Sequence, residues 1–469
     1  MGKIINGYIL PHPPIIVPEI GEVRGNYALD TITAVKKAAK EIAKDKPGTI
    51  ILSSPHAPCF SDYVYIWDSA KLRGDFSAFG HQKVGMEFDN NRQLAFHIAE
   101  QAQFAGIQAG NLKSEQKAQY GISDQLDHGA MVPLYFISQE LADFKLVCIS
   151  TPFMSNIELY KLGKCIKEAV TSCEEDIVYV ASGDLSHRLT ADAPAGYHAK
   201  GREYDVYLID KLNKNAIEDI LDISEDYMEV AGECGTRSFI IMLGAMDGLE
   251  IKTDIYSYEG PFGVGYLVAK VNVLKENNKK DILQNYLQNK KAALDSIKNN
   301  ESPLVKLARQ AIETFIKEKR ILEVPSWLPD NFLHDCAGVF VSLKKHGRLR
   351  GCIGTIAATR ENIAAEIINN AISAATQDPR FPPLSIDELP DLIYSVDVLG
   401  KPEKITSVDQ LDVKRYGVIV SSGLKRGLLL PDLEGIDTAQ MQVQIALEKA
   451  GLKKGEKYDL ERFEVVRYQ

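Results

Sequence analysis

The chain has 469 residues, of which 45% are hydrophobic and 25% are charged, and its formal net charge is −10. This composition is typical of a globular protein, and the length allows about two to four domains. An acidic chain without a long basic run is a poor nucleic-acid binder, and no apolar stretch reaches the roughly 18 residues of a membrane span. We therefore expect neither nucleic acid nor a membrane as a partner.

The cysteines are scattered through the sequence. All seven lack paired spacing, which is typical of a reducing compartment where disulfides do not form. Pro11, Pro13 and Pro14 also interrupt the first apolar segment, so this segment does not have the form of a signal peptide. Both features predict a cytoplasmic protein.

The first part of the chain alternates apolar runs typical of strands with helical stretches. The predicted strands are, in chain order, Ile4–Leu10, Thr49–Leu52, Lys145–Ile149 and Ile177–Val180. The predicted helices are Thr31–Lys44, Asn91–Ala105 and Asn156–Ser172. Because strands separated by helices form sheets that are covered on both sides, we predict an α/β domain with a central sheet and helices on both faces.

A polar stretch, Lys275–Asn300, follows this region, and its apolar residues recur at helical spacing, which predicts a connecting helix. Ser302 and Pro303 then have the residue types of a helix N-cap and a first helical position. The last part combines one strong helix, Glu361–Thr376, with short strand-like runs, which predicts a compact α+β unit. We therefore divide the chain into residues 1–272, a helical linker over 273–301, and a smaller domain over 302–469.

Histidines follow three of the predicted strands. The first, second and fourth strands end shortly before His12, His56 and His187, respectively. In open α/β sheets, ligands bind outside the carboxyl ends of the strands, and imidazole is the commonest side-chain ligand of transition metals. The positions of these histidines therefore indicate a shared site, in which His12 and His56 are the candidate metal ligands.

A third ligand has to come from elsewhere in the sequence. Two histidines and one carboxylate on one face of an iron leave positions open for substrate and dioxygen. Glu233 has a glycine before it and the pair Cys234–Gly235 after it, a setting that can present its carboxylate to a pocket. Cys234 is a competitor for the same metal, and the alternative for both residues is an ordinary solvated turn.

Five short motifs resemble those of LigB-like class III extradiol dioxygenases and of the related Memo family. They occur in the family's order over about residues 1–270 and lie at Leu10–Pro14, Ser54–His56, Asp127–Gly129, Gly183–His187 and Gly232–Gly235. The resemblance implies a non-haem Fe(II) held by His12, His56 and Glu233. The Memo branch has a cysteine near the third ligand position, which matches Cys234 and would favour copper or zinc.

The same resemblance implies roles for the remaining polar residues. His187 would be the base that takes a proton from an ortho-dihydroxy aromatic substrate, and histidine suits this task because it titrates close to neutral pH. His128 would be an acid for a later step, and Asp184 would orient His187. The substrates implied are a small aromatic diol and dioxygen. The alternatives are that Asp184 caps a turn and that His128 begins a helix.

The most distinctive string of the last part is Gly347–Thr355, which places Cys352 between small residues and near Arg348 and Arg350. Nearby arginines favour the thiolate form of a cysteine, so Cys352 and Arg350 are candidate site residues. The alternative is a glycine-bent strand with a buried cysteine.

This string is the hallmark of the AMMECR family, and Pro379–Pro383 and Tyr458–Tyr468 also fit that family. The resemblance covers about residues 302–469. Memo-like and AMMECR-like proteins are associated with a radical-SAM protein in the set called AmmeMemoRadiSam, so the resemblance implies such a partner. The chain has no Cys-x3-Cys-x2-Cys pattern and is not expected to be that enzyme itself.

Overall fold

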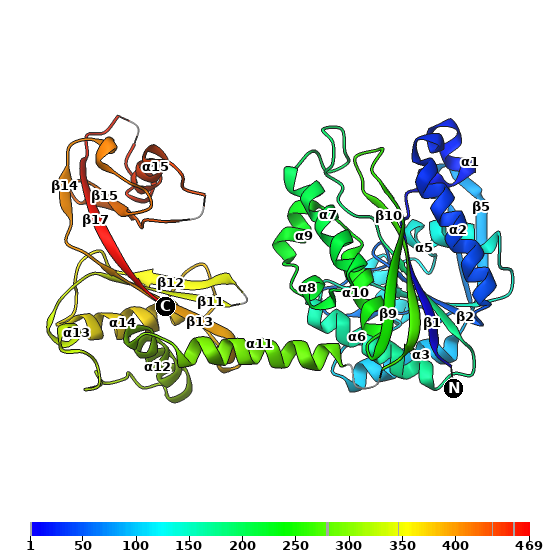
Figure 1. Cartoon of the computed structure of the whole chain (residues 1–469), viewed down its shortest axis with the longest axis horizontal. Helices are drawn as coiled ribbons and strands as arrows, with labels where there is room; N and C mark the ends of the chain where they lie inside the picture. The colour runs from blue at the N-terminus through cyan, green and yellow to red at the C-terminus, as the bar shows by residue number, and fades with distance from the viewer. Residues whose placement is uncertain (1, 278–280, 346, 434, 454) are drawn as a thin grey trace. The chain divides into compact units, whose positions relative to one another are not determined.

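The computed structural model describes residues 2–277, 281–345, 347–433, 435–453 and 455–469. The chain divides into two compact units, Met1–Leu287 and Gln288–Gln469 (Figure 1). All seven cysteines are free thiols. None of the described helices combines the length and the apolar character that a membrane crossing requires.

The first unit is built on an eight-stranded sheet with the order β4-β5-β7-β2-β8-β1-β10-β9. Its centre is parallel, because β7, β2, β8 and β1 all run in the same direction, whereas β10 and β9 are antiparallel additions at one side. A separate two-stranded ladder is formed by β3 and β6. The strands are β1 (Ile4–Leu10), β2 (Thr49–Ser54), β3 (Val64–Tyr65), β4 (Lys71–Phe76), β5 (His81–Asn90), β6 (Ala109–Gly110), β7 (Lys145–Ser150), β8 (Ile177–Ser182), β9 (Leu249–Glu259) and β10 (Tyr266–Glu276).

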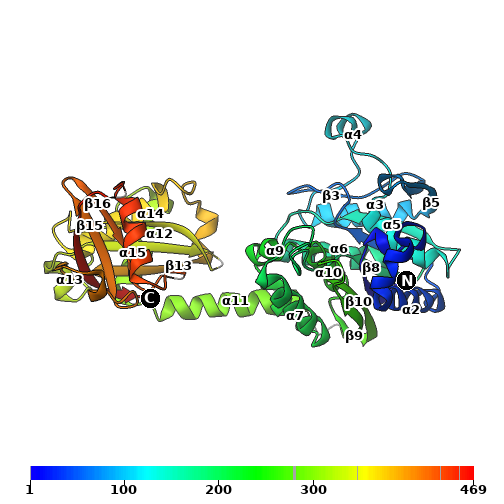
Figure 2. The ribbon, with the colours of Figure 1, turned by 90° about the horizontal axis from the view of Figure 1, so that it is seen from above.

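Helices cover both faces of this sheet, as the view from above shows (Figure 2). Side chains alternate along β2: Ile51 joins the hydrophobic core under α3, α6 and α10, whereas Ile50 and Leu52 join the core under α2 and α5. The strand is buried on both faces, which is why its residues Ile50–Leu52 are all apolar. The helices are α1 (Pro18–Gly21), α2 (Leu29–Asp45), α3 (Arg92–Phe104), α4 (Ser114–Tyr120), α5 (His128–Ser138), α6 (Asn156–Thr171), α7 (Ala199–Asn213), α8 (Ile217–Leu221), α9 (Glu225–Ala231) and α10 (Thr236–Ala245).

The sequence explains how α6 begins and how closely it packs against α10. Ser155 accepts a hydrogen bond from the Glu158 amide and starts α6 with a capping box. Gly163 of α6 lies directly against α10, because a Cβ built on this glycine would be 2.2 Å from the carbonyl oxygen of Ile241. The small residue therefore sets the short distance between the two helices.

The second unit has an antiparallel sheet with the order β12-β11-β13-β17-β15-β16, and β14 also pairs with β17. Helices α12 and α14 pack on one part of this sheet around a core that includes Leu307 and Ile367. The elements are α11 (Ile282–Asn299, which crosses the boundary between the units), α12 (Pro303–Glu318), α13 (Asp330–His334), β11 (Val339–Lys345), β12 (Arg348–Gly354), α14 (Ile363–Thr376), β13 (Leu392–Leu399), β14 (Glu403–Ile405), β15 (Tyr416–Ser422), β16 (Lys425–Leu429), α15 (Ala439–Lys449) and β17 (Asp459–Tyr468).

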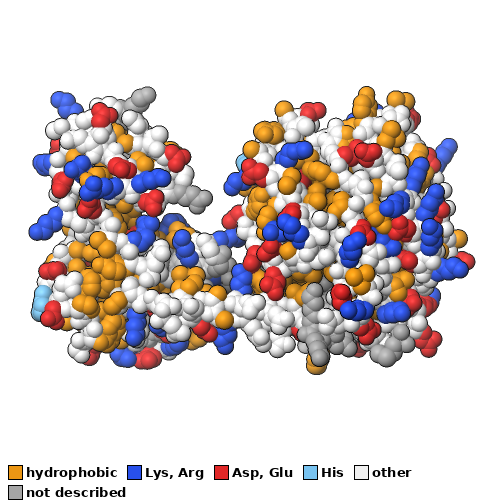
Figure 3. All heavy atoms as spheres, viewed as in Figure 1, with side chains coloured by type: hydrophobic (Ala, Val, Ile, Leu, Met, Phe, Trp, Pro, Cys, Tyr) orange, Lys and Arg blue, Asp and Glu red, His pale blue; other side chains and the backbone are white. Residues whose placement is uncertain are grey.

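The structure confirms the predicted fold class, an α/β unit with helices on both faces and a smaller α+β unit. It also confirms the predicted start of α12, because the Ser302 side chain accepts a hydrogen bond from the Val305 amide and Pro303 is the first helical residue. Within the predicted linker, Lys275 and Glu276 are the last residues of β10, and residues 278–280 lie outside the described residues. On the face shown in Figure 3, acidic and basic side chains are interspersed.

Candidate metal centre

The candidate site lies at the carboxyl ends of the central parallel strands. His12 follows β1, His56 follows β2, and His128 is the first residue of α5. Asp127 caps α5 by accepting a hydrogen bond from the Ala130 amide, and its Oδ1 also accepts one from the Ser54 hydroxyl at 2.6 Å. This pair of contacts ties the start of α5 to the end of β2, so two of the three histidines are placed by one polar connection.

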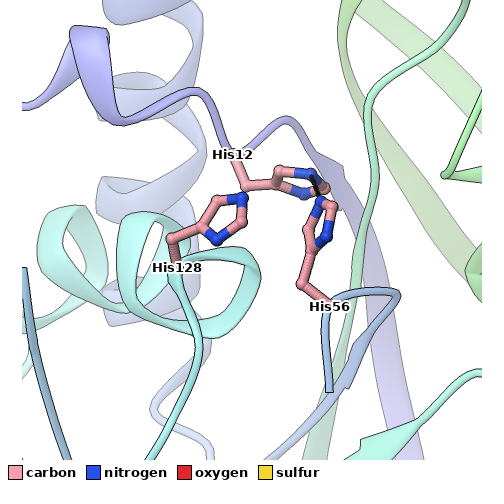
Figure 4. Close-up of side chains that lie close together, drawn as sticks. All are labelled: His12, His56 and His128. Atoms are coloured by element: carbon pink, nitrogen blue, oxygen red, sulfur yellow. Dashed lines mark hydrogen bonds between the residues drawn. The ribbon is translucent and has the colours of Figure 1, made fainter. Parts of the chain in front are cut away.

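The three histidines point toward one another (Figure 4). One ring nitrogen from each of His12, His56 and His128 lies within 4.8 Å of the other two. The Nε2 atoms of His12 and His56 are 2.9 Å apart, and the rings of His56 and His128 are stacked with centroids 4.2 Å apart. The arrangement presents three imidazole nitrogens to one point, which is the donor set of many transition-metal sites.

Ser182 fixes the orientation of His12. Its hydroxyl donates a hydrogen bond to the carbonyl oxygen of Gly129 at 2.5 Å, and its oxygen lies 2.9 Å from Nδ1 of His12. Because the single proton of the hydroxyl is used by Gly129, the serine oxygen accepts the Nδ1 proton. Nε2 of His12 is therefore the unprotonated nitrogen, with its lone pair directed at the other two histidines.

The protein surroundings favour the neutral form of all three imidazoles, of which His12 is buried, His128 half-buried and His56 exposed. Burial lowers the pKa of His12 well below its ordinary value, and the adjacent His56 and His128 lower this pKa further. Burial is also the main cause that lowers the pKa of His56 to about 4, with a further contribution from His128 and an opposing one from Asp127. The pKa of His128 is lowered by burial. Neutral imidazoles are the form that binds metals, because a protonated ring has no free lone pair.

Asp184 and His187 lie beside the three histidines, in the segment after β8. Oδ1 of Asp184 accepts a hydrogen bond from the His12 amide at 2.9 Å, and its Oδ2 is 3.7 Å from Nε2 of His12. Burial raises the pKa of Asp184 to about 7, against the effect of that hydrogen bond. Burial lowers the pKa of His187, and among the described residues its buried Nδ1 has no hydrogen-bond partner. Burial therefore favours the neutral form of the His187 ring, against the opposing effect of the Gly232 and Leu185 backbone.

Glu233 and Cys234 differ in how they approach the site. Oε2 of Glu233 accepts hydrogen bonds from the amide and the hydroxyl of Thr236, at 2.7 and 2.6 Å, whereas its buried Oε1 has no partner among the described residues. Sγ of Cys234 lies 3.6 Å from Nε2 of His12. Burial raises the pKa of both side chains, and at Glu233 the hydrogen bonds from Thr236 and the charge of Arg237 oppose this rise.

The sequence did not indicate two of the groups that organise this site. Ser182 ends a strand and has no motif signal, and the contact between Ser54 and Asp127 joins residues that are 73 positions apart. Phe79 also reaches the site, with its ring centroid 5.4 Å from that of His128. The Ser-Pro-His and Asp-His-Gly motifs contain Ser54 and Asp127, but their residue types alone do not predict the bond between them.

Comparison with known proteins identifies the two units. Residues 6–269 match the family model of the catalytic LigB subunit of aromatic ring-opening dioxygenases. The chain belongs to the LigB family. Residues 305–469 match the AMMECR1 family model, so the chain combines a LigB unit with an AMMECR1 unit, and both resemblances noted in the sequence are confirmed.

Relatives extend over one or both units. Protein CA_C1420 of Clostridium acetobutylicum is 42% identical over 467 residues, which is 99% of each chain. A protein of Thermotoga maritima is 48% identical over 171 residues, 36% of this chain and 98% of its own. Among solved structures, protein PH0010 from Pyrococcus horikoshii is 33% identical with a TM-score of 0.33, and it covers 35% of this chain and 88% of its own.

The residues of the LigB unit fit a bound metal. LigB proteins are typically metal-dependent, and this chain supplies three neutral imidazoles whose nitrogens face one another. Nδ1 of His12 is held by Ser182, as is usual for metal-binding histidines. The set suits iron, zinc or copper. The structure adds His128 to the candidates for the third ligand, and the choice between Glu233 and Cys234 stays a prediction.

The AMMECR1 unit contains the candidates Cys352 and Arg350 on β12. Sγ of Cys352 accepts a hydrogen bond from the Ser342 hydroxyl at 3.2 Å, and its amide donates to Oδ2 of Asp378 at 2.9 Å. Arg350 forms a bidentate ion pair with Glu388, at 2.9 and 3.0 Å. The guanidinium of Arg350 is therefore engaged by a carboxylate, and a role for Cys352 in catalysis stays a prediction.

Proposed function

We propose that the LigB unit is a non-haem Fe(II)-dependent extradiol dioxygenase that opens the ring of an ortho-dihydroxy aromatic compound. The proposal is carried by the convergence of His12, His56 and His128, with Asp184 and His187 beside them, at the carboxyl ends of the parallel strands. His12 and His56 are assigned as metal ligands. His128, Glu233 and Cys234 compete for the third position.

The side chains support a division of labour. Bound iron supplies Lewis-acid and one-electron chemistry at the site. The buried Nδ1 of His187 accepts the phenolic proton, since it is neutral and has no partner among the described residues. Asp184 and Ser182 hold His12 in place from two sides, through its amide and its Nδ1 atom. The ring of Phe79 beside His128 provides an apolar wall for an aromatic substrate.

Oxygen uptake tests this proposal. The protein would be purified without oxygen, its metals quantified, Fe(II) added, and oxygen consumption followed with a panel of catechols such as protocatechuate. We expect His12→Ala to lose metal binding, and His187→Ala to keep the metal but lose turnover. His97→Ala is the matched control, because His97 lies in α3 and bonds to Ser172, the residue after α6, at 2.8 Å. Full metal occupancy in His12→Ala would refute the site assignment.

A second candidate function is a Memo-like metal-binding module without ring cleavage. The observation that favours it is the 3.6 Å distance between Sγ of Cys234 and Nε2 of His12. A thiolate ligand prefers Cu(I) or zinc, whereas a carboxylate suits iron. Measurements of metal affinity and of oxygen uptake would separate the two functions. A larger loss of metal affinity in Cys234→Ser than in Glu233→Gln, together with no catechol-dependent oxygen uptake, would support the metal-binding module.

A further inference from the structure

Two arginines near the metal centre each have a buried Nε atom without a hydrogen-bond partner among the described residues. The Nε atoms of Arg188 and Arg237 are buried and, among the described residues, make no hydrogen bond or ion pair. A buried guanidinium nitrogen normally has a hydrogen-bond partner, because leaving a buried donor unsatisfied is costly. Other half-buried arginines of this chain follow that rule, with bidentate or paired carboxylates in Arg309–Glu301, Arg350–Glu388 and Arg467–Asp397.

Arg237 is located at the same edge of the sheet as the histidines. It is in the first turn of α10, three residues after Cys234. Its guanidinium carbon lies 4.7 Å from the ring centroid of Phe153, which follows β7, and its charge opposes the rise that burial causes in the pKa of Cys59, which follows β2. The loop after β7 therefore contacts this side chain, and the loop after β2 lies close enough for its charge to act on Cys59.

Arg188 lies in the segment after β8, which forms backbone hydrogen bonds with the segment between α9 and α10. The His187 amide donates to the Gly232 carbonyl at 3.2 Å, and the Cys234 amide donates to the Asp184 carbonyl at 3.2 Å. The side chain of Arg188 lies against Gly232, since a Cβ built there would be 3.0 Å from its Nε. Both guanidinium groups thus contact or adjoin the segment that contains Glu233 and Cys234.

We propose that Arg237, assisted by Arg188, binds the anionic group of the substrate of the metal centre, a carboxylate or a phosphate on an aromatic compound. A guanidinium group matches either oxyanion with two parallel hydrogen bonds. Phe153, whose side chain is 60% exposed, provides a flat apolar surface beside the charge. The inference rests on the proposed function, because it assigns the anion to the substrate of that site.

Calorimetric titration of the full-length chain tests this subsite without turnover. The probes are benzoate and inorganic phosphate, with benzyl alcohol as a neutral ring of similar size. We expect saturable binding of one anion, at least about 10-fold tighter than that of the alcohol, and a loss of about 10-fold or more in Arg237→Gln. If benzoate binds more tightly than phosphate, the anionic group of the substrate is a carboxylate. If phosphate binds more tightly, that group is a phosphate.

Control variants separate binding from folding. Arg237→Lys keeps the charge and should bind at an intermediate level. Arg92→Gln should bind as the unmodified chain does, because Arg92 follows β5 at the opposite edge and donates to the carbonyl of Asp68. Equal anion binding in Arg237→Gln and in the unmodified chain, or saturable binding of neither anion, would overturn the subsite. Anion binding that depends on Arg237, in a protein without oxygen uptake, would uphold the subsite and refute only the dioxygenase.

Discussion

Replacing Ser182 with alanine should weaken metal binding although Ser182 is not itself a ligand. The hydroxyl accepts the Nδ1 proton of His12 at 2.9 Å and donates to the carbonyl of Gly129 at 2.5 Å. It thereby fixes the tautomer of His12 and connects this histidine to the residue after His128. Without the hydroxyl, Nδ1 of His12 and the carbonyl of Gly129 both lose a partner, and the ring is free to place its proton on Nε2.

The structure sets the size of the effect. Partners that hold metal-binding histidines typically contribute about 10–100-fold to metal affinity, which corresponds to about 1.4–2.7 kcal/mol. The loss of two buried hydrogen bonds should also lower the free energy of unfolding of the LigB unit by about 2 kcal/mol. Ser182 is fully buried, so water cannot readily replace the hydroxyl.

Competition with a chelator would measure the affinity of the full chain for Fe(II), and urea unfolding would measure stability. Ser238→Ala is the matched control: Ser238 is equally buried and shares a hydrogen bond of 2.6 Å with Ser53, but it contacts none of the three histidines. We expect similar stability losses in the two variants and a loss of affinity in Ser182→Ala alone. Affinity within twofold of the unmodified chain would refute the role of Ser182.

Three further predictions concern stability. Gly163→Ala should destabilise the LigB unit by about 1–3 kcal/mol in urea unfolding, because the new methyl group would collide with the carbonyl of Ile241; unchanged stability would show that the helices can separate at no cost. Glu366→Gln should cost the AMMECR1 unit about 3 kcal/mol, since this buried carboxylate accepts hydrogen bonds from two backbone amides and two hydroxyl groups; a loss below about 1 kcal/mol would contradict it. Arg350 lowers the pKa of Glu388 to about 2, below the value of about 4.3 in an unfolded chain. The pair therefore stabilises the fold above pH about 4.3, and this stability is lost as pH falls toward 2. Glu388→Gln should flatten the pH dependence of unfolding in that window, and an unchanged slope would exclude the pair as its cause.

Much of the fold could be predicted because the strands of the LigB unit carry a strong signal. β1 was expected at Ile4–Leu10 and is found there, and the helix expected at Asn156–Ser172 ends one residue earlier. Both are fixed by local patterns, an apolar run and a capping box. By contrast, the antiparallel strands β9 and β10 were not predicted, since partly exposed strands of mixed composition give a weak periodic signal.

The candidate site was predicted in part. The positions of His12 and His56 follow from strand ends, which sequence patterns can show. His128 illustrates the limit. Its interpretation as a helix start is confirmed, because α5 begins at this residue, and its ring nitrogen lies near those of His12 and His56, whereas its role as an acid stays a prediction. The pairing of Arg350 with Glu388 joins residues 38 positions apart. No local pattern contains such a contact, so the arginine next to Cys352 could not be assigned a partner in advance.

The long parallel connections of the LigB unit determine when during synthesis the metal centre can exist. The hydrogen bond from His12 to Asp184 joins residues 172 positions apart, and Cys234 is 222 positions from His12. At about 5–20 residues per second, roughly 10–35 s separate the synthesis of His12 from that of Asp184. In that interval the first two histidines belong to a nascent chain whose sheet lacks β8. The complete set of candidate metal-binding side chains therefore exists only after the whole LigB unit has been synthesised.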